Sequence, residues 1–364
     1  MRKLILFVVL IGLISCEKND SDNNPAPKWE LVSEMSNRYL LAGKVLNDNL
    51  ILMSNDSILT YNTSNRIINS RLIPGRKSIG THSPFRFDNS DLIGLPTYFP
   101  NNPGRLDSLA INIYKLNSDL NTTIEYTQIP EIDTKGYVTP VNTGCCREVE
   151  YNFMSNYDNR LSVLLVGWDK SDSSSMDNSD NYYRILRINI TQSSNLTSIV
   201  DKIIGIQELP FFESFSKYDL ISFKNFDFVV TSDGTYIISE NGFHSKLEST
   251  QAMFKYSDKL YQLRANSLYV SNDGLTWNKK VDISIEVDWS LTTKAVLIEN
   301  TLIDYGWTGW LKKSNILTGE SELITHEGLP DSDCSFIIDF NNYLYLGLDN
   351  GLVYRIEKNK VIDN

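Results

Sequence analysis

Short runs in which apolar residues alternate with other residues fill most of the chain. The clearest lie at residues 340–357, where the run YLYLGL is followed by Asp349-Asn350-Gly351 and then by the run LVYRIE. Alternation with a period of two predicts β-strands, and an Asp-Asn-Gly segment between two such runs predicts a tight hairpin turn. No long window shows the 3.6-residue apolar period of a helix. The sequence therefore predicts an all-β fold with few helices.

Looser copies of this hairpin recur along the chain, and a small polar pair containing Asn or Asp precedes each of them. The pairs lie at residues 48–49, 89–90, 158–159, 224–225, 257–258, 299–300 and 341–342. Their first residues are separated by 41, 69, 66, 33, 42 and 42 residues, and four of these separations lie near the length of one propeller blade. The two long separations contain insertions.

This repeat predicts a β-propeller, most simply one of seven four-stranded blades. A single blade cannot cover both of its faces, so radial repetition with a closed ring suits it. An open β-solenoid is the alternative, but a solenoid needs a more uniform repeat and capping repeats. The segment before each polar pair is expected to form the innermost strand. The last blade lacks an outer strand, which either the segment VID near the C-terminus or the segment KWELV at residues 28–32 could supply.

One turn resembles a known propeller motif. SNDGLTW, from Ser271 to Trp277, is similar to the Asp-box of sialidase-like propellers in a form one residue shorter. Ser271 and Asp273 are expected to hydrogen-bond the backbone of the turn, Gly274 to adopt a positive φ, and Trp277 to pack the outer strand onto the blade. Asp-boxes generally brace structure, so the resemblance implies the fold and not sialidase activity.

The N-terminal segment is expected to be a targeting sequence. Arg2 and Lys3 precede the apolar run LILFVVLIGLIS, which is too short for an ordinary membrane-spanning helix. Leu13-Ile14-Ser15-Cys16 resembles the lipobox of bacterial lipoproteins, which implies lipid attachment at Cys16; an ordinary secretory signal with an incidental cysteine is the alternative. The expected organisation is a signal peptide at 1–15, a lipidated flexible tether at 16–28 and a single propeller domain at 29–364.

The resemblance also implies a location. Glu17 follows Cys16 where many inner-membrane lipoproteins of Gram-negative bacteria have Asp, which implies an outer-membrane lipoprotein, either periplasmic or surface-exposed. The net charge of −11 and the absence of a Lys/Arg cluster disfavour nucleic acid as a partner.

Insertions between the predicted strands gather on one face of the propeller, at residues 100–108, 130–145, 169–181, 208–215 and 326–333. Loops on a rigid scaffold are where binding residues concentrate, so this face is the candidate site. Exposed aromatic rings suit stacking on sugars or docking of a protein, and Arg beside acidic groups suits carboxylates or sugar hydroxyls. The candidate ligand-binding residues are His82, Arg86, Tyr98, Phe99, Arg147, Glu148, Trp168, Trp307, Trp310, Asp331 and Asp333. The alternative is that the rings fill wedges between blades and the charges form solvated salt bridges.

No metal and no cofactor is predicted. The sequence lacks HExxH, GxSxG, P-loop and CxxC patterns, and its three histidines fall in separate predicted blades. With Cys16 lipidated, an odd number of cysteines remains in an oxidising compartment. A strained disulfide between the adjacent Cys145 and Cys146 is expected, with Cys334 buried and free; the alternative, Cys334 paired with Cys145 or Cys146, requires the intervening loop to fold over the channel mouth.

The first functional hypothesis is a non-catalytic, lipid-anchored envelope propeller that binds a glycan or a partner protein through its loop-rich face. A propeller glycoside hydrolase or lyase acting on polysaccharide is one alternative, and a structural scaffold in an outer-membrane complex is another. Two carboxylates in a deep pocket would favour the enzyme, a shallow aromatic rim would favour glycan binding, and a broad apolar patch would favour the scaffold.

Overall fold

The computed structural model describes residues 27–72, 92–98, 108–115, 125–128, 132–133, 153–168, 181–192, 196–206, 219–283, 292–306 and 310–362, with gaps of one or two residues inside the longer ranges. Within these residues, no helix is long and apolar enough to cross a membrane.

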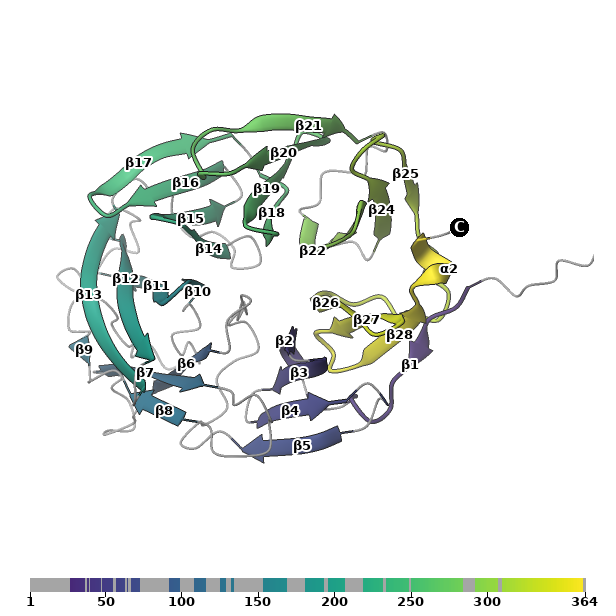
Figure 1. Cartoon of the computed structure of the whole chain (residues 1–364), viewed down its shortest axis with the longest axis horizontal. Coiled ribbons are helices and arrows are strands. Elements are labelled where there is room, and N and C mark those ends of the chain that lie inside the picture. The colour runs from purple at the N-terminus through teal and green to yellow at the C-terminus, as the bar shows by residue number, and fades with distance from the viewer. Residues whose placement is uncertain are drawn as a thin grey trace, which may run out of the picture.

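The described strands form seven antiparallel sheets around a ring, as Figure 1 shows. Six sheets follow a regular path of four strands. One contains β2 (Leu40–Leu46), β3 (Asn49–Ser54), β4 (Ser57–Tyr61) and β5 (Ile67–Leu72). The next regular sheets contain β10 (Phe153–Tyr157), β11 (Arg160–Trp168), β12 (Asn181–Gln192) and β13 (Leu196–Ile206), then β14 (Asp219–Phe223), β15 (Phe226–Thr231), β16 (Gly234–Ser239) and β17 (Gly242–Leu247). The others contain β18 (Ala252–Tyr256), β19 (Lys259–Arg264), β20 (Ser267–Ser271) and β21 (Asn278–Asp282), then β22 (Thr292–Ile298), β23 (Thr301–Gly306), β24 (Leu311–Asn315) and β25 (Ser321–Leu323), and finally β26 (Cys334–Phe340), β27 (Tyr343–Leu348), β28 (Val353–Glu357) and β1 (Glu30–Leu31).

The remaining sheet departs from this regular path. β6 (Leu92–Tyr98) pairs with β7 (Ser108–Lys115), and β7 pairs with both β8 (Glu125–Gln128) and the short β9 (Ile132–Asp133). The innermost strand predicted for this blade, with its pair at 89–90, lies outside the described residues. The β-propeller class is thus confirmed, but the expectation of seven four-stranded blades is met only in part, because six sheets have the four-strand path and this one does not.

Burial explains why the second strands are rich in apolar residues. β3 and β27 are buried along almost their whole length, on both faces of their sheets. Each blade is covered by a neighbour on either side, so its central strands need apolar residues pointing both ways. Figure 1 places the first strand of each regular sheet toward the centre of the ring, as the sequence predicts.

The recurring polar pair is a tight turn between the first and second strands of each blade. Its first residue has a positive φ in every described copy: 57° at Asp48, 50° at Asp158, 51° at Lys224, 47° at Ser257, 53° at Glu299 and 57° at Asn341. This left-handed conformation favours Gly, Asn and Asp, which explains the first residue in three of the six described pairs, Asp48, Asp158 and Asn341. We call the face that carries these turns the turn face. The opposite face, with the turns between second and third strands and the connections between blades, is the loop face.

The turn that resembles an Asp-box has the internal geometry expected from its sequence. The Ser271 hydroxyl accepts a hydrogen bond from the Gly274 amide at 2.8 Å, and Gly274 has a φ of 86°. One Asp273 carboxylate oxygen accepts from the amides of Leu275 and Thr276, at 2.8 and 2.7 Å. These hydrogen bonds hold the pKa of the Asp273 carboxyl well below its usual range. Trp277 packs in the wedge against the preceding blade, not only onto its own.

The N-terminal strand closes the ring. β1 pairs with β28 through Glu30 opposite Arg355 and Leu31 opposite Tyr354. Of the two candidates for the outer strand of the last blade, the segment at 28–32 is therefore the correct one. The other candidate overlaps the C-terminal helix α2 (Asn359–Ile362) and is not a strand.

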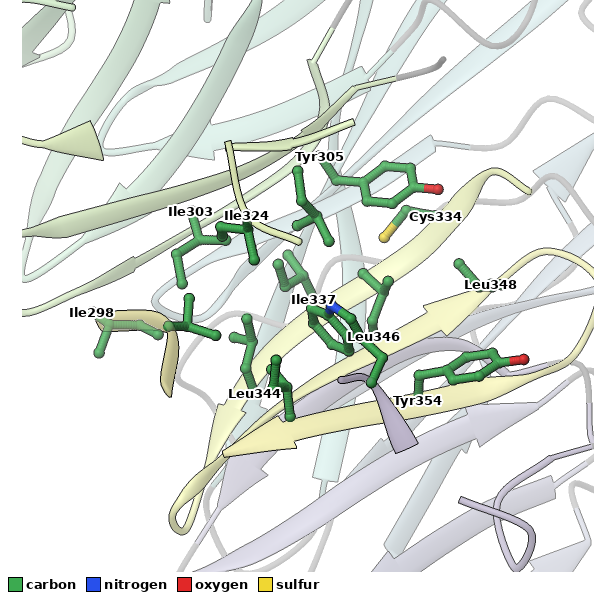
Figure 2. Close-up of a cluster of buried hydrophobic side chains, with 14 residues drawn as sticks. Ile298, Ile303, Tyr305, Ile324, Cys334, Ile337, Leu344, Leu346, Leu348 and Tyr354 are labelled. Carbon is green, nitrogen blue, oxygen red and sulfur yellow. The ribbon is translucent and has the colours of Figure 1, made fainter. Parts of the chain in front are cut away.

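Trp29 fixes this closure. Its side chain is 2% exposed, its indole N–H donates to the Thr325 carbonyl at 3.0 Å, and its backbone N–H donates to the Glu327 carbonyl at 2.9 Å. It belongs to the apolar cluster between the sheets of β22–β25 and β26–β28, which Figure 2 shows. Trp29 thus joins the start of the chain to the last two blades.

Cys334 lies in the same cluster, near Tyr305 in Figure 2. The thiol is buried and free, as the sequence predicts. Burial raises its pKa to about 12, so it stays protonated at neutral pH.

Replacement of Trp29 by Ala tests the role of ring closure. We expect Trp29→Ala to lower the free energy of unfolding by about 3–5 kcal/mol, because it removes a fully buried aromatic side chain from the closing wedge. Urea denaturation monitored by circular dichroism measures this change. Glu30→Ala is the control: it removes only an exposed ion pair to Arg355 at 3.4 Å and should cost less than about 1 kcal/mol. Equal losses in the two variants would contradict a closing role for Trp29.

Candidate functional site

The described candidate residues all lie at the loop face. Tyr98 ends β6 and Trp168 ends β11, so both sit where a second strand reaches this face. Trp310 directly precedes β24, and Asp331 and Asp333 directly precede β26. The candidates outside the described residues are His82, Arg86, Phe99, Arg147, Glu148 and Trp307, together with the lipid-attachment candidate Cys16 and the disulfide candidates Cys145 and Cys146.

Asp331 and Asp333 belong to an acidic rim, which also includes Asp349. The Ser332 hydroxyl donates to the Asp349 carboxylate, and the Asp349 amide donates to the Asp333 carbonyl at 2.9 Å. Tyr305, on β23 of the preceding blade, donates a hydrogen bond from its hydroxyl to the Ser332 carbonyl. These bonds fix the backbone of the rim while the Asp331 and Asp349 side chains remain exposed.

Tyr305 is a residue that sequence reasoning missed. Its side chain is 1% exposed, and burial raises the pKa of its hydroxyl, with smaller contributions from Cys334 and the three acidic residues of the rim. The hydroxyl therefore stays protonated and acts as a hydrogen-bond donor to the rim. Its position in the apolar strand run TLIDYGW gave no sign of this contact.

Trp310 packs on its own blade but stays half-buried. Its ring lies against the backbone of Gly306, where an added Cβ would overlap it. The Lys312 ammonium lies 5.5 Å from the centre of the ring, within the range of a cation–π contact. The alternative, in which the aromatic rings fill space within the fold, is thus partly correct for Trp310. Its ring packs against Gly306, but the residue remains partly exposed.

An ion pair lies buried next to Trp310. Asp304 is fully buried, and its nearer carboxylate oxygen is 3.7 Å from the Lys312 ammonium, which is also buried. Neither Asp304 oxygen accepts a hydrogen bond, so the carboxylate is poorly compensated. Burial raises the pKa of Asp304 to about 7, while the Lys312 charge acts in the opposite direction. The two residues face each other across β23 and β24.

His326, in one of the predicted insertions, has a structural role. Its Nε2 accepts a hydrogen bond from the Leu311 amide at 3.0 Å, which requires this nitrogen to be unprotonated. Burial also lowers the pKa of His326. The neutral imidazole thus satisfies the first amide of β24.

A second buried charge cluster joins two blades. Asp227 on β15 is fully buried and receives the Arg187 guanidinium of the preceding blade at 2.7 Å. The Ser222 hydroxyl donates to the same carboxylate at 2.7 Å, and Arg160 lies 3.6 Å from it. The Arg160 pKa is lowered chiefly by burial, which the Asp227 charge opposes. This cluster is enclosed, so its position indicates a contact between blades and not a ligand site.

A pocket opens on the turn face, opposite the predicted site. It has a volume of about 530 Å³ and lies between the turns β22–β23 and β26–β27 and the C-terminal segment. Across the described part of the chain, no three His, Cys, Asp or Glu side chains converge in a way that could hold a metal ion.

The fold has counterparts among solved structures, although no protein-family model and no curated protein matches the chain. A catalytically inactive virginiamycin B lyase from Staphylococcus aureus, solved with quinupristin, is 10% identical with a TM-score of 0.51 over 91% of this chain and 98% of its own. The β-propeller domain of Cps50 (Swd1) from Myceliophteria thermophila is 9% identical with a TM-score of 0.50, over 90% and 98%. A chain of a mitotic checkpoint complex is 9% identical with a TM-score of 0.50, over 92% of each chain. These similarities show that the chain is a β-propeller and show the fold alone.

The buried pair Asp304–Lys312 can be tested by a double-mutant cycle. Asp304→Leu leaves the Lys312 ammonium buried without a counterion and should cost about 3–5 kcal/mol of stability. Lys312→Met should cost less, because an Asp304 with a pKa near 7 can neutralise itself by taking up a proton. The double variant should be close to the wild type in stability.

Urea denaturation at pH 7 of the four proteins measures this coupling. Additive losses in the double variant would show that the two charges do not interact, and equal losses in the single variants would contradict the raised pKa.

Proposed function

We propose that the chain is a lipid-anchored envelope β-propeller that binds a glycan or a partner protein through its loop face, without catalysing a reaction. The observation that carries this proposal is the acidic rim at 331–333 and 349. Its backbone is fixed by hydrogen bonds across two blades, yet Asp331 and Asp349 are exposed and Asp333 is half-buried. A rigid frame with exposed polar groups is suited to recognition, because little conformational freedom is lost on binding.

The negative charge of the protein disfavours acidic partners. The rim lies on a protein with a net charge of −11, so an acidic polysaccharide would be repelled. A protein with basic groups fits the rim, and a neutral glycan could use the half-buried ring of Trp310 together with carboxylates that accept hydrogen bonds from sugar hydroxyls.

The glycoside hydrolase alternative requires an accessible carboxyl group with a raised pKa. Asp304 has the raised pKa, but it is fully buried beside Lys312 and cannot reach a substrate. Asp304 therefore gives no support to this alternative.

The position of the N-terminal strand suits a tether. Figure 1 places β1 at the outer edge of the ring, away from the central opening. A lipid at Cys16 would be joined to this edge by about a dozen residues, a reach of roughly 40 Å when extended. An anchor at the edge leaves both faces of the ring open to partners.

Lipid attachment is tested by Cys16→Ser. We expect the wild-type chain to incorporate a labelled fatty acid and to fractionate with membranes, and the variant to lose both properties. A variant that keeps the label would overturn attachment at Cys16.

Binding through the loop face is tested with a soluble chain from residue 27 on a glycan array and in pull-downs from envelope extracts. The paired substitutions Asp331→Lys and Asp333→Lys should weaken any retained interaction about tenfold or more, because they reverse charge at the rim. Glu240→Lys is the matched control: Glu240 is exposed in the turn between β16 and β17 on the turn face.

If Glu240→Lys weakened the retained interaction as much as the paired rim substitutions, the binding would reflect non-specific electrostatic attraction and not recognition by the rim. Cleavage of model glycosides, with neither glycans nor proteins retained, would overturn the proposal in favour of an enzyme.

A further inference from the structure

The pocket on the turn face is formed by three segments that are distant in the sequence. Its lining residues are Ile298, Glu299, Asn342, Tyr343, Glu357, Lys358, Asn359 and Ile362. Its volume of about 530 Å³ lies within the range of small-ligand sites. The C-terminal segment that follows β28 forms one wall, so the end of the described chain contributes directly to the pocket.

The charges of the lining are unequally compensated. Lys358 is neutralised by Asp339, whose two carboxylate oxygens lie 3.0 and 3.2 Å from its ammonium. Glu357 lies 3.1 Å from the exposed ammonium of Lys360. Among the interactions of the described residues, Glu299 has no ion pair, so its carboxylate leaves a net negative charge at the pocket.

Glu299 also has an unfavourable backbone conformation. Glu299 has a φ of 53°, in the left-handed region that costs most side chains about 1–2 kcal/mol. The equivalent positions Asp48, Asp158 and Asn341 carry residues that tolerate this conformation. Ser257 and Lys224 are further exceptions, but Ser257 carries no charge, and the Lys224 ammonium lies 5.6 Å from the centre of the Phe223 ring and so has a packing partner. A strained residue with an unpaired charge at a pocket is a candidate for function.

The apolar residues of the lining define the rest of the ligand. Ile298 is buried at the base of the turn, and Ile362 is partly buried on α2. Two isoleucine side chains can cover a short methylene chain, while the Glu299 carboxylate can bind a cation at its end. Asn342 and Asn359 supply amide oxygens as further acceptors.

We propose that this pocket binds an alkylammonium group, either a free aliphatic amine or the lysine side chain of a peptide. The methylene stem lies against Ile298 and Ile362, and the ammonium lies at Glu299. This site is on the face opposite the acidic rim, so this proposal does not depend on the proposed function, and each can be tested without the other.

The test uses the full chain in detergent, with the isoleucine methyl groups labelled for NMR. The probes are cadaverine, the tripeptide acetyl-Gly-Lys-Gly-amide, and the same tripeptide with norleucine in place of lysine. At least one ammonium probe should shift the Ile298 and Ile362 methyl signals with saturation, and the norleucine peptide should not. Saturation by cadaverine alone identifies a free amine as the ligand, and saturation by the lysine peptide identifies a peptide side chain.

Three variants separate binding from folding. Glu299→Gln should weaken binding about five- to tenfold, because it removes the charge and keeps the shape. Glu299→Asn should weaken binding similarly while raising the melting temperature, because Asn tolerates the left-handed conformation. Lys224→Asn is the matched control: it relieves the equivalent turn in another blade and should leave binding unchanged.

Three results would overturn the proposal. They are no shift with either ammonium probe, equal binding of the norleucine peptide, and unchanged affinity in Glu299→Gln.

Discussion

Each blade of the ring buries both faces of its sheet against its neighbours, and the last blade is completed only when the first segment of the chain returns to pair with its edge strand β28. Two residues of β1 supply the backbone pairing with β28, Trp29 packs between the last two blades, and Val32 and Met35 pack between the last blade and the first. Pairing over two residues is too short to be stable alone. The indole, with its hydrogen bond to the Thr325 carbonyl, therefore carries much of the closure and links it to the preceding blade.

Not every junction between blades depends on apolar packing. Between the sheets of β10–β13 and β14–β17, the Asp227 carboxylate is shared by a hydroxyl and two guanidinium groups. The Lys255 ammonium, on the next sheet, donates to the carbonyls of Asn156 and Ser222 at 2.8 and 3.0 Å and so joins three inner strands. Buried charges of this kind are costly to separate from their partners, so they fix the relative positions of the blades more than they add stability.

The sequence predicted what is local and repeated. A position with a positive φ favours Gly, Asn and Asp, so the turns that begin at Asp48 and Asn341 could be recognised in the sequence as a recurring polar pair. The outer strand of the last blade was narrowed to two candidates by counting strands. Contacts across strands were not predictable, because the Asp304–Lys312 pair depends on the register of β23 and β24, and the Tyr305 contact with Ser332 depends on how two blades pack. Neither contact joins residues at a sequence spacing that could be recognised in advance.

The two candidate sites lie at opposite ends of one apolar wedge. Ile298 lines the pocket on the turn face, while Tyr305 donates to the acidic rim on the loop face, and both belong to the cluster that holds Trp29. This cluster, shown in Figure 2, lies between the last two blades and receives Trp29 of the N-terminal segment. A ligand that binds only the closed ring at either face must stabilise it by mass action. Because the same packed side chains support both sites, loosening of the closure would impair recognition at the two faces together.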